Sequence, residues 1–396
     1  MNATTVTVRP FGSEQPFTID IADVYTQLQA VPDQRKRRGV RYPLAVLLTI
    51  ALIAKLSGYS QVRALAEWAR ERAEELAALF GLERTTMPHP TTGSRVLSRA
   101  VAATALEQAL SRLLAPPATA ELAPRASRPI ALDGKTLCGT IPAGSSQGVH
   151  LLSAYDVNEG RVLEQGAVAK KENEIVAAPR VLNGLDVHGA IVTGDVMFAQ
   201  RALSTQIVEA GGDYCWVVTQ NQATLFDDLK LLFSPAVIEV APGWSPIALD
   251  FVTVEKVDKG HGRRELRRLR VSSMLADYAD WPYLAPSFEL VRICWEGNDV
   301  SREERYGITS APLTVLSATQ LLGVVRGHWR IETGLHRRRD VTLGEDASQV
   351  RMGQAPHILA SLNNAVCGVA AKGGMTNLAA LQRSLAAAFD RLLFRR

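Results

Sequence analysis

Cysteines and long apolar runs are both scarce in this chain, and their scarcity excludes several classes of protein. The four cysteines, at positions 138, 215, 294 and 367, include no C-x-x-C pair, so the sequence predicts neither a zinc knuckle nor a disulfide framework. The longest apolar run, residues 44–54, is interrupted only by Thr49 and is well short of the ~20 residues that a membrane span requires. We therefore expect a reducing compartment for the chain and a buried helix for this run.

An export signal is also missing near the start, because no basic stretch is followed by an apolar block. Together with the cysteine pattern, this predicts a cytoplasmic protein with no membrane partner. The chain has 396 residues, of which 47% are hydrophobic and 21% charged. This is the composition of a globular protein with roughly two to three domains. The formal net charge of +4 is compatible with nucleic acid as a partner but does not identify one.

Basic residues are unevenly distributed along the chain and gather in three clusters. The clusters are Arg35, Lys36, Arg37, Arg38 and Arg41; Arg263, Arg264, Arg267, Arg268 and Arg270; and Arg337, Arg338 and Arg339. Three separate clusters favour a long anionic ligand such as DNA. Each cluster taken alone fits a solvated surface equally well.

The first part of the chain has the pattern of short helices. Residues 1–20 are polar and mixed and predict a loose arm, whereas helical spacing predicts helices at 20–31, 42–56, 60–82, 92–101 and 104–115. Ser94, Arg95, Ser98 and Arg99 resemble the reading helix of a helix-turn-helix protein, although most helical bundles do not read DNA. Residues 115–129 are rich in alanine and proline and predict a linker. We therefore expect a helical DNA-binding region over residues 1–125.

Beyond the linker the pattern changes to strands that alternate with helices. Strands are predicted at 129–135, 149–157 and 160–169, then a helix at 173–182, a buried strand at 190–195, a helix at 198–210 and a strand at 214–218. This order predicts an α/β fold over residues 126–235, with a mixed sheet flanked by helices. Residues 236–312 are rich in β-type residues and predict an antiparallel β insertion, after which residues 313–396 return to a helical pattern.

Three acidic residues stand where they could form one site. Asp133 and Asp195 end predicted strands, and open α/β sheets bind ligands at that edge. Glu332 lies in a helical segment with His328 four residues before it, His336 four after and Arg339 seven after, all on roughly one face. Carboxylates suit Mg²⁺ or Mn²⁺, and two such ions can activate the attacking oxygen and stabilise the leaving oxygen in phosphoryl transfer. Other readings stay open: either aspartate could cap a helix or form a turn, and Glu332 could be a surface acid paired with Arg339.

The short phrases around these acids carry a resemblance to a known family. They are ALDGKTLCG around Asp133, HLLSAYD at 150–156, KENEI at 171–175, IVTGD at 191–195, GDYCWVVTQNQ at 212–222, KGHGRRELRRL at 259–269 and HWRIETGLHRRRDVTLGEDASQVR at 328–351, with DQRKRRGVRYPL and AEWA near the start. In these phrases the chain resembles bacterial insertion-sequence transposases of the DDE class, in particular the H-repeat-associated branch with a β-rich insertion. The resemblance covers nearly the whole chain.

The resemblance implies an RNase H-like catalytic core that a β insertion interrupts between its second and third acids. Asp133, Asp195 and Glu332 would then be the catalytic triad that holds two Mg²⁺ or Mn²⁺ ions. The separations agree, because Asp195 follows Asp133 by 62 residues and Glu332 follows Asp195 by 137. The residues expected to contact DNA are Arg35, Lys36, Arg37, Arg38, Arg41, Lys135, Asn221, Gln222, His261, Arg263, Arg264, His328, Trp329, Arg330, His336 and Arg339.

Some positions depart from the pattern that the resemblance leads us to expect. Thr219 and Gln220 stand where the family usually has Lys-Gly, and Arg337 and Arg339 stand where it usually has tryptophan and leucine. The segment 194–198, GDVMF, replaces the usual Ala-Asp-Ala-Leu-His around the second acid. The triad itself is complete.

The leading hypothesis is a DNA transposase that cuts the ends of its element and joins the released 3′ hydroxyl to target DNA. Double-stranded DNA would be the partner, and a homodimer on DNA is expected because two ends are cut in one event. The alternative is a catalytically silent or domesticated transposase-derived protein that binds DNA without cleaving it. A two-carboxylate hydrolase acting on glycosides would leave the basic residues around Glu332 unexplained.

Overall fold

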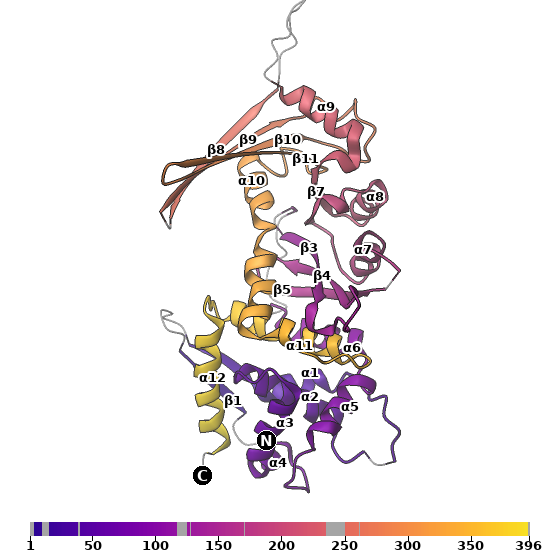
Figure 1. Cartoon of the computed structure of the whole chain (residues 1–396), viewed down its shortest axis with the longest axis vertical. Coiled ribbons are helices and arrows are strands. Elements are labelled where there is room, and N and C mark those ends of the chain that lie inside the picture. Colours follow the sequence, from indigo (N-terminus) through magenta and orange to yellow (C-terminus); the bar gives the residue numbers. More distant parts are fainter. Residues whose placement is uncertain are drawn as a thin grey trace, which may run out of the picture. The chain divides into compact units, whose positions relative to one another are not determined.

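The fold combines helices and strands in a mixed α/β architecture (Figure 1). The computed structural model describes residues 4–9, 16–38, 40–116, 125–126, 128–169, 171–234, 250–260 and 262–394. Over these residues it contains twelve α-helices and eleven β-strands, which confirms the α/β class expected from the sequence. No helix in the described part of the chain is both long and apolar enough to cross a membrane.

The chain forms two compact units, each assembled from separate stretches of sequence. The first unit comprises residues 1–120, 134–173 and 330–396, and the second comprises residues 121–133 and 174–329. The chain passes from the second unit to the first inside strand β3 (Arg128–Leu137), between Asp133 and Gly134. The division of the sequence into four consecutive regions stays a prediction.

Helices from both ends of the chain make up most of the first unit. They are α1 (Ile21–Leu28), α2 (Leu44–Leu56), α3 (Val62–Glu71), α4 (Ala73–Phe80), α5 (Pro90–Arg99), α6 (Ala103–Leu114), α11 (Ala355–Lys372) and α12 (Leu378–Leu393). Helices α2 and α11 are buried along nearly their whole length, because they carry apolar or small residues on every face. The apolar run at residues 44–54 is therefore a core helix, as expected.

Two expectations for the first unit were wrong in detail. The supposed loose arm contains two antiparallel strands, β1 (Thr5–Val8) and β2 (Phe17–Asp20), because alternation in TVTV buries Val6 and Val8 and exposes the threonines between them. The single helix expected at 60–82 is broken at Arg72 (φ −117°, ψ 27°) into α3 and α4. The Arg72 guanidinium lies over the Trp68 ring and pairs with Asp390 at 2.9 Å.

The first unit also contains strands β3, β4 (Val149–Asp156) and β5 (Arg161–Val168) of the larger sheet. Strand β4 pairs antiparallel with β5, and β3 lies on the other side of β4. Two π-helical segments, Glu332–His336 and Arg338–Thr342, follow one another in this unit. Short 3₁₀ turns lie at Cys138–Thr140 and Glu345–Ala347. The strands carry Lys135 and Tyr155, and the first π-helical segment carries Glu332 and His336.

The second unit is organised around a sheet whose strand order is β3-β6-β7-β11-β10-β9-β8. Its remaining strands are β6 (Ala190–Gly194), β7 (Asp213–Val218), β8 (Val252–Gly260), β9 (Arg263–Ser272), β10 (Ser287–Glu296) and β11 (Asp299–Thr309). Strands β3, β6 and β7 are parallel neighbours, as the alternation of strands and helices predicts. The other neighbours in this unit are antiparallel.

The expected β insertion is present as β8 to β11, and it extends this sheet. Strand β11 pairs antiparallel with β7 along Tyr306–Thr309, so the insertion and the parallel strands share one hydrogen-bonded ladder. The first part of the predicted insertion, residues 235–249, lies outside the described residues.

Four helices flank the sheet of the second unit: α7 (Glu174–Asn183), α8 (Arg201–Glu209), α9 (Ala223–Phe233) and α10 (Ala318–Gly327). Helices α9 and α10 lie on opposite faces of β8–β11 (Figure 1). Leu321, Leu322 and Val324 of α10 pack with Leu269 and Phe288 in one buried cluster. This packing fixes the end of α10, where His328 begins the next stretch.

Candidate active site

Asp133 and Asp195 come from neighbouring parallel strands of the second unit. The last residue pair between β3 and β6 is Leu132 with Gly194, and each aspartate is the next residue along its strand. Asp195 leaves the sheet at this point, as expected for a strand end. Asp133 does not end a strand, because β3 continues to Leu137. The strand pairing therefore places both aspartates at the carboxyl end of β6, where the hydrogen-bonded ladder between β3 and β6 stops.

The loop after Asp195 is held by contacts that leave the carboxylate accessible. The Asp195 side chain is 65% exposed, and its Oδ1 lies 3.5 Å from Nε2 of His328. The hydrogen bond from this imidazole, with a weaker contribution from Arg305, holds the pKa of the Asp195 carboxyl below its ordinary value. Gly194 is required beside it, because a Cβ there would lie 2.6 Å from the Phe198 ring.

Asn221 and Gln222, predicted to contact DNA, use their side-chain amides to hold this loop. Asn221 Nδ2 donates to the carbonyl of Val196 at 2.8 Å, and Gln222 Nε2 donates to the carbonyl of Ala199 at 2.9 Å. A DNA role for these two amides stays a prediction. The amide oxygen of Asn221 also accepts from the Thr219 hydroxyl at 3.1 Å, so both amides are engaged in holding the loop that follows Asp195.

Glu332 and His336 lie in a π-helical segment of the first unit. Such segments, hydrogen-bonded i→i+5, are rare and often occur at functional sites. The Glu332 side chain is 53% exposed, the His336 side chain only 5%, and Oε1 of Glu332 lies 3.7 Å from Nδ1 of His336. Gly334, between them, leaves room for Tyr155 of β4, because a Cβ at this glycine would lie 2.5 Å from the Tyr155 hydroxyl oxygen.

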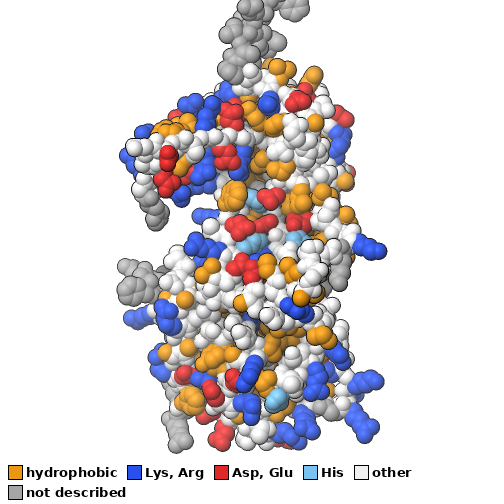
Figure 2. Space-filling model, in the orientation of Figure 1, with side chains coloured by type: hydrophobic (Ala, Val, Ile, Leu, Met, Phe, Trp, Pro, Cys, Tyr) orange, Lys and Arg blue, Asp and Glu red, His pale blue; other side chains and the backbone are white. Residues whose placement is uncertain are grey.

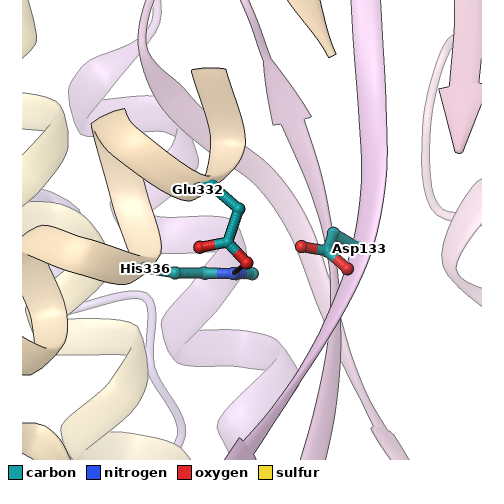
Figure 3. A group of neighbouring side chains, drawn as sticks. All are labelled: Asp133, Glu332 and His336. Carbon is teal, nitrogen blue, oxygen red and sulfur yellow. Dashed lines mark ion pairs between the residues drawn. The ribbon is translucent and has the colours of Figure 1, made fainter. Parts of the chain in front are cut away.

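One group of side chains has the composition of a metal site. Figure 3 shows Glu332 and His336 projecting from the same helical segment of the first unit, each with a ligand atom that could hold a metal ion. A carboxylate and an imidazole are donors that fit a divalent cation such as Mn²⁺. Asp133, in the second unit, offers a further carboxylate of the same chemistry.

Two basic residues predicted to contact DNA are buried in ion pairs of the first unit. Arg339 has no exposed surface, and its guanidinium lies 2.7 Å from Glu345. It also donates to Oε1 of Gln165 at 3.4 Å. Lys135, with 9% of its side chain exposed, pairs with Asp340 at 2.7 Å. Both cations are buried and already paired with acids in this conformation, so neither is placed to meet a DNA phosphate.

The N-terminal basic cluster is mostly on the surface. Lys36, Arg37, Arg38 and Arg41 are exposed, whereas Arg35 is half-buried and pairs with Asp33 at 2.7 Å. This pair, through its hydrogen bonds, holds the pKa of the Asp33 carboxyl below its ordinary value. The exposed members of the cluster could lie against phosphates, and Arg35 organises the turn that carries them.

The basic residues of the β insertion are largely neutralised by acids on adjacent strands. Figure 2 shows Lys/Arg and Asp/Glu side chains interleaved over β8–β11. Arg267 pairs with Asp258, Arg268 with Glu255 and Arg270 with Glu289. Arg263 is exposed, Arg264 lies 5.2 Å over the Trp295 ring, and His261 lies outside the described residues. Among the described residues of this cluster, the cations that form no such ion pair are therefore Arg263 and Arg264, at the end of the β8–β9 hairpin.

The remaining predicted residues lie around the end of α10. Trp329 is 53% exposed, and the Arg305 guanidinium lies 5.5 Å over its ring. Arg330 donates to the carbonyl of Val157 at 3.4 Å in the first unit. An exposed aromatic ring with an arginine over it is a surface that suits a nucleic acid, so Trp329 keeps its predicted role as a proposal.

Sequence reasoning missed two residues that shape these positions, Thr193 and Tyr155, whereas it interprets Glu345 as a structural acid that balances the arginines. Thr193 lies two residues before Asp195, on the same face of β6, and contacts His328 at 3.1 Å. Tyr155 contacts the π-helical turn at Gly334, and Glu345 neutralises Arg339. Only Thr193 had a signal in the sequence, namely its two-residue spacing from Asp195 in a strand.

Comparison with known proteins identifies family models over most of the chain. Residues 25–114 match the family described as DDE_Tnp_1-associated, and residues 125–365 match the transposase DDE domain. The chain is 28% identical over 352 residues to "Putative transposase YncI" of Escherichia coli O157:H7, covering 87% of this chain and 86% of that protein. It is 25% identical over 383 residues to "H repeat-associated putative transposase YhhI" of Escherichia coli (strain K12), covering 94% and 97%. An uncharacterised protein from the dhlA 3′ region of Xanthobacter autotrophicus is 32% identical over 287 residues, covering 71% and 92%.

Proposed function

Because the chain belongs to the DDE transposase family, we propose that it cleaves the ends of an insertion sequence and joins them to target DNA. The observation that carries this proposal is the side-by-side position of Asp133 and Asp195, each one residue beyond the last pair of β3 and β6. Glu332, in the π-helical segment of the first unit, supplies a third carboxylate. We propose that these strands form an RNase H-like core and that the three acids are its catalytic triad.

In this proposal Asp133, Asp195 and Glu332 together hold two divalent cations, Mg²⁺ or Mn²⁺. When bound, these ions activate the attacking oxygen and stabilise the leaving oxygen of a phosphodiester. The Asp195 and Glu332 side chains are more than half exposed, so their oxygens are accessible to a DNA phosphate. Water would break the phosphodiester at the element's end to release a 3′ hydroxyl, which would then attack a phosphate of target DNA.

DNA would be held by cations that the structure leaves on the surface. These are Lys36, Arg37, Arg38 and Arg41 of the N-terminal cluster and Arg263 and Arg264 of the β8–β9 hairpin. Contacts of this kind set the position of DNA more than they read its sequence. We also propose that two copies act together on DNA, because an insertion has two ends to cut.

The test is cleavage of duplex DNA that carries the element's terminal repeat, in the presence of Mn²⁺ or Mg²⁺. Asp133→Asn and Glu332→Gln should abolish cleavage while leaving DNA binding in EDTA within about twofold, because they remove metal ligands and add no bulk. Asp280→Asn is the matched control, since Asp280 is 95% exposed and pairs only with Arg201 among the contacts described. Full cleavage by either triad variant would overturn the proposal, and wild-type binding without cleavage would indicate a silent DNA-binding protein.

A further inference from the structure

The sequence predicts that His328 contacts DNA. In the second unit, however, its side chain faces protein groups and indicates a different role. Its side chain is only 14% exposed, although the Asp195 carboxylate that it faces is 65% exposed. Both ring nitrogens are directed at protein groups. Nδ1 lies 3.1 Å from the hydroxyl of Thr193, and Nε2 lies 3.5 Å from Oδ1 of Asp195.

The imidazole spans two residues on one face of the same strand. Thr193 is in β6 and Asp195 follows its end, and residues two apart in an extended chain project to the same side. The imidazole has two ring nitrogens, Nδ1 and Nε2, so it can contact Thr193 with one and Asp195 with the other. Thr193 is nearly fully buried, so it supplies an anchor that does not move with the solvent-exposed loop.

The anchor fixes how the imidazole can donate. The Thr193 hydroxyl donates to the carbonyl of Ile130 on the neighbouring strand β3 at 3.3 Å, so its oxygen is left to accept from Nδ1 of the imidazole. The other ring nitrogen, Nε2, is directed at Oδ1 of Asp195. With both nitrogens engaged, the ring has no further donor for a DNA phosphate.

We propose that His328 is a positioning residue that orients the Asp195 carboxylate for a divalent cation, and that Thr193 holds the imidazole in place. Oδ1 of Asp195 faces the imidazole, which leaves Oδ2 for the cation. Carboxylates that bind metals are commonly oriented by such outer hydrogen bonds, and losing one lowers metal affinity about 10- to 100-fold. The inference rests on the proposed function, because it takes Asp195 as a metal ligand.

Helix α10 gives this arrangement its rigidity. The backbone N–H of His328 donates to the carbonyl of Val324 at 3.2 Å, which continues the helix. Val324 belongs to the apolar cluster that packs α10 on the sheet. The imidazole is thus held from its backbone by the helix and from its ring by β6, so it cannot follow Asp195 if that loop moves.

The experiment measures Mn²⁺ binding by the full chain without DNA, from the electron paramagnetic resonance signal of free Mn²⁺. His328→Ala should weaken Mn²⁺ binding about 10- to 100-fold. His328→Gln should retain affinity within about threefold, because its amide N–H groups can donate to the Thr193 oxygen and to Asp195. Thr193→Val should weaken binding in the same direction by several-fold, and this buried residue cannot act through a lost DNA contact.

Duplex DNA binding in EDTA, titrated with salt, separates the two roles of His328. If His328 only positions Asp195, the DNA affinity of His328→Ala should depend on salt concentration as wild type does. If His328 contacts one phosphate, its loss should reduce the slope of log DNA-binding constant against log salt concentration by about 0.9. Trp329→Ala is the neighbouring control, expected to weaken DNA binding and leave Mn²⁺ affinity unchanged. Thermal unfolding in EDTA identifies any variant that is misfolded.

The outcomes distinguish this inference from the proposed function. If wild type binds Mn²⁺ and Thr193→Val and both His328 variants bind it equally well, the inference is wrong and the proposed function stands. A reduced salt slope for His328→Ala with unchanged Mn²⁺ affinity would return His328 to DNA contact. If wild type binds no Mn²⁺, the metal site fails and both proposals fail with it.

Discussion

Replacing Gly334 by alanine tests how the π-helical segment keeps Glu332 and His336 in place. A Cβ at residue 334 would lie 2.5 Å from the Tyr155 hydroxyl oxygen and 3.5 Å from Cζ of that ring. Carbon atoms pack favourably at about 3.5–4.0 Å, so the hydroxyl must move by about 1 Å. Tyr155 is 3% exposed and cannot swing into solvent.

The expected cost follows from two opposing effects. Overpacking of a well-filled interior costs about 1–3 kcal/mol, while replacing a helical glycine by alanine recovers roughly 0.5–1 kcal/mol. We therefore expect Gly334→Ala to lower the free energy of unfolding by about 1–2 kcal/mol. In a Tyr155→Phe background the nearest ring atom is at an ordinary distance, so the same substitution should cost nothing or stabilise slightly.

A double-mutant cycle measures this coupling by urea unfolding in EDTA, with intrinsic fluorescence as the signal. The expected coupling between residues 155 and 334 is about 1–3 kcal/mol, which is the overpacking cost that the phenylalanine removes. Mn²⁺ affinity should follow the same pattern, because Glu332 and His336 lie on either side of the glycine. Additive effects of the two substitutions would refute the reasoning, since they would mean that the hydroxyl is not what excludes a side chain at 334.

Three further predictions concern charges whose positions the structure defines. Arg339→Leu should destabilise the protein by about 3–5 kcal/mol because it leaves Glu345 buried without its guanidinium partner. Arg339→Leu with Glu345→Leu should cost less, and thermal or urea unfolding of wild type and the two variants checks this. Burial lowers the pKa of Lys55 to about 8. Between about pH 8 and pH 10 this lysine therefore binds fewer protons in the folded state than in the unfolded state. The free energy of unfolding should rise with pH across that window. Urea unfolding at both ends of the window should show this rise in wild type and its loss in Lys55→Met; an equal rise in the variant would contradict the assignment. Arg37→Ala should reduce the salt slope of DNA binding by about 0.9, whereas Arg268→Ala, which removes a cation already paired with Glu255, should not.

The fold class and the neighbouring aspartates could be predicted from local patterns. A buried run at 190–194 followed by a helix and another buried run indicates parallel strands, and the acid after such a strand lies at its carboxyl end. The strand β1 was missed although TVTV alternates, because four residues between polar segments carry little weight on their own. Asp133 was placed near a strand end because the strand was predicted only over residues 129–135, whereas β3 continues to Leu137.

Arg339 was misplaced because the prediction assumed α-helical winding. Seven residues after Glu332 is roughly two α-turns, which puts the two side chains on one face. Winding of the i→i+5 kind takes more residues for each turn, so Arg339 turns away from that face and into the interior, where Glu345 meets it. A sequence does not reveal this change of winding. The cross-strand ion pairs of β8–β11 were equally hidden, because they depend on strand register.

The shared ladder between β7 and β11 limits how this protein family can vary in length. Strands β10 and β11 pair from Glu296 with Asp299 to Ser287 with Ile308, and β11 continues onto β7. Removing one residue from a single strand would turn every side chain beyond it to the opposite face. A hairpin here therefore keeps both its pairing and the facing of its side chains when it changes by two residues on each strand. Each such step changes the reach of the hairpin by about 6.6 Å, so relatives should differ in steps of this size.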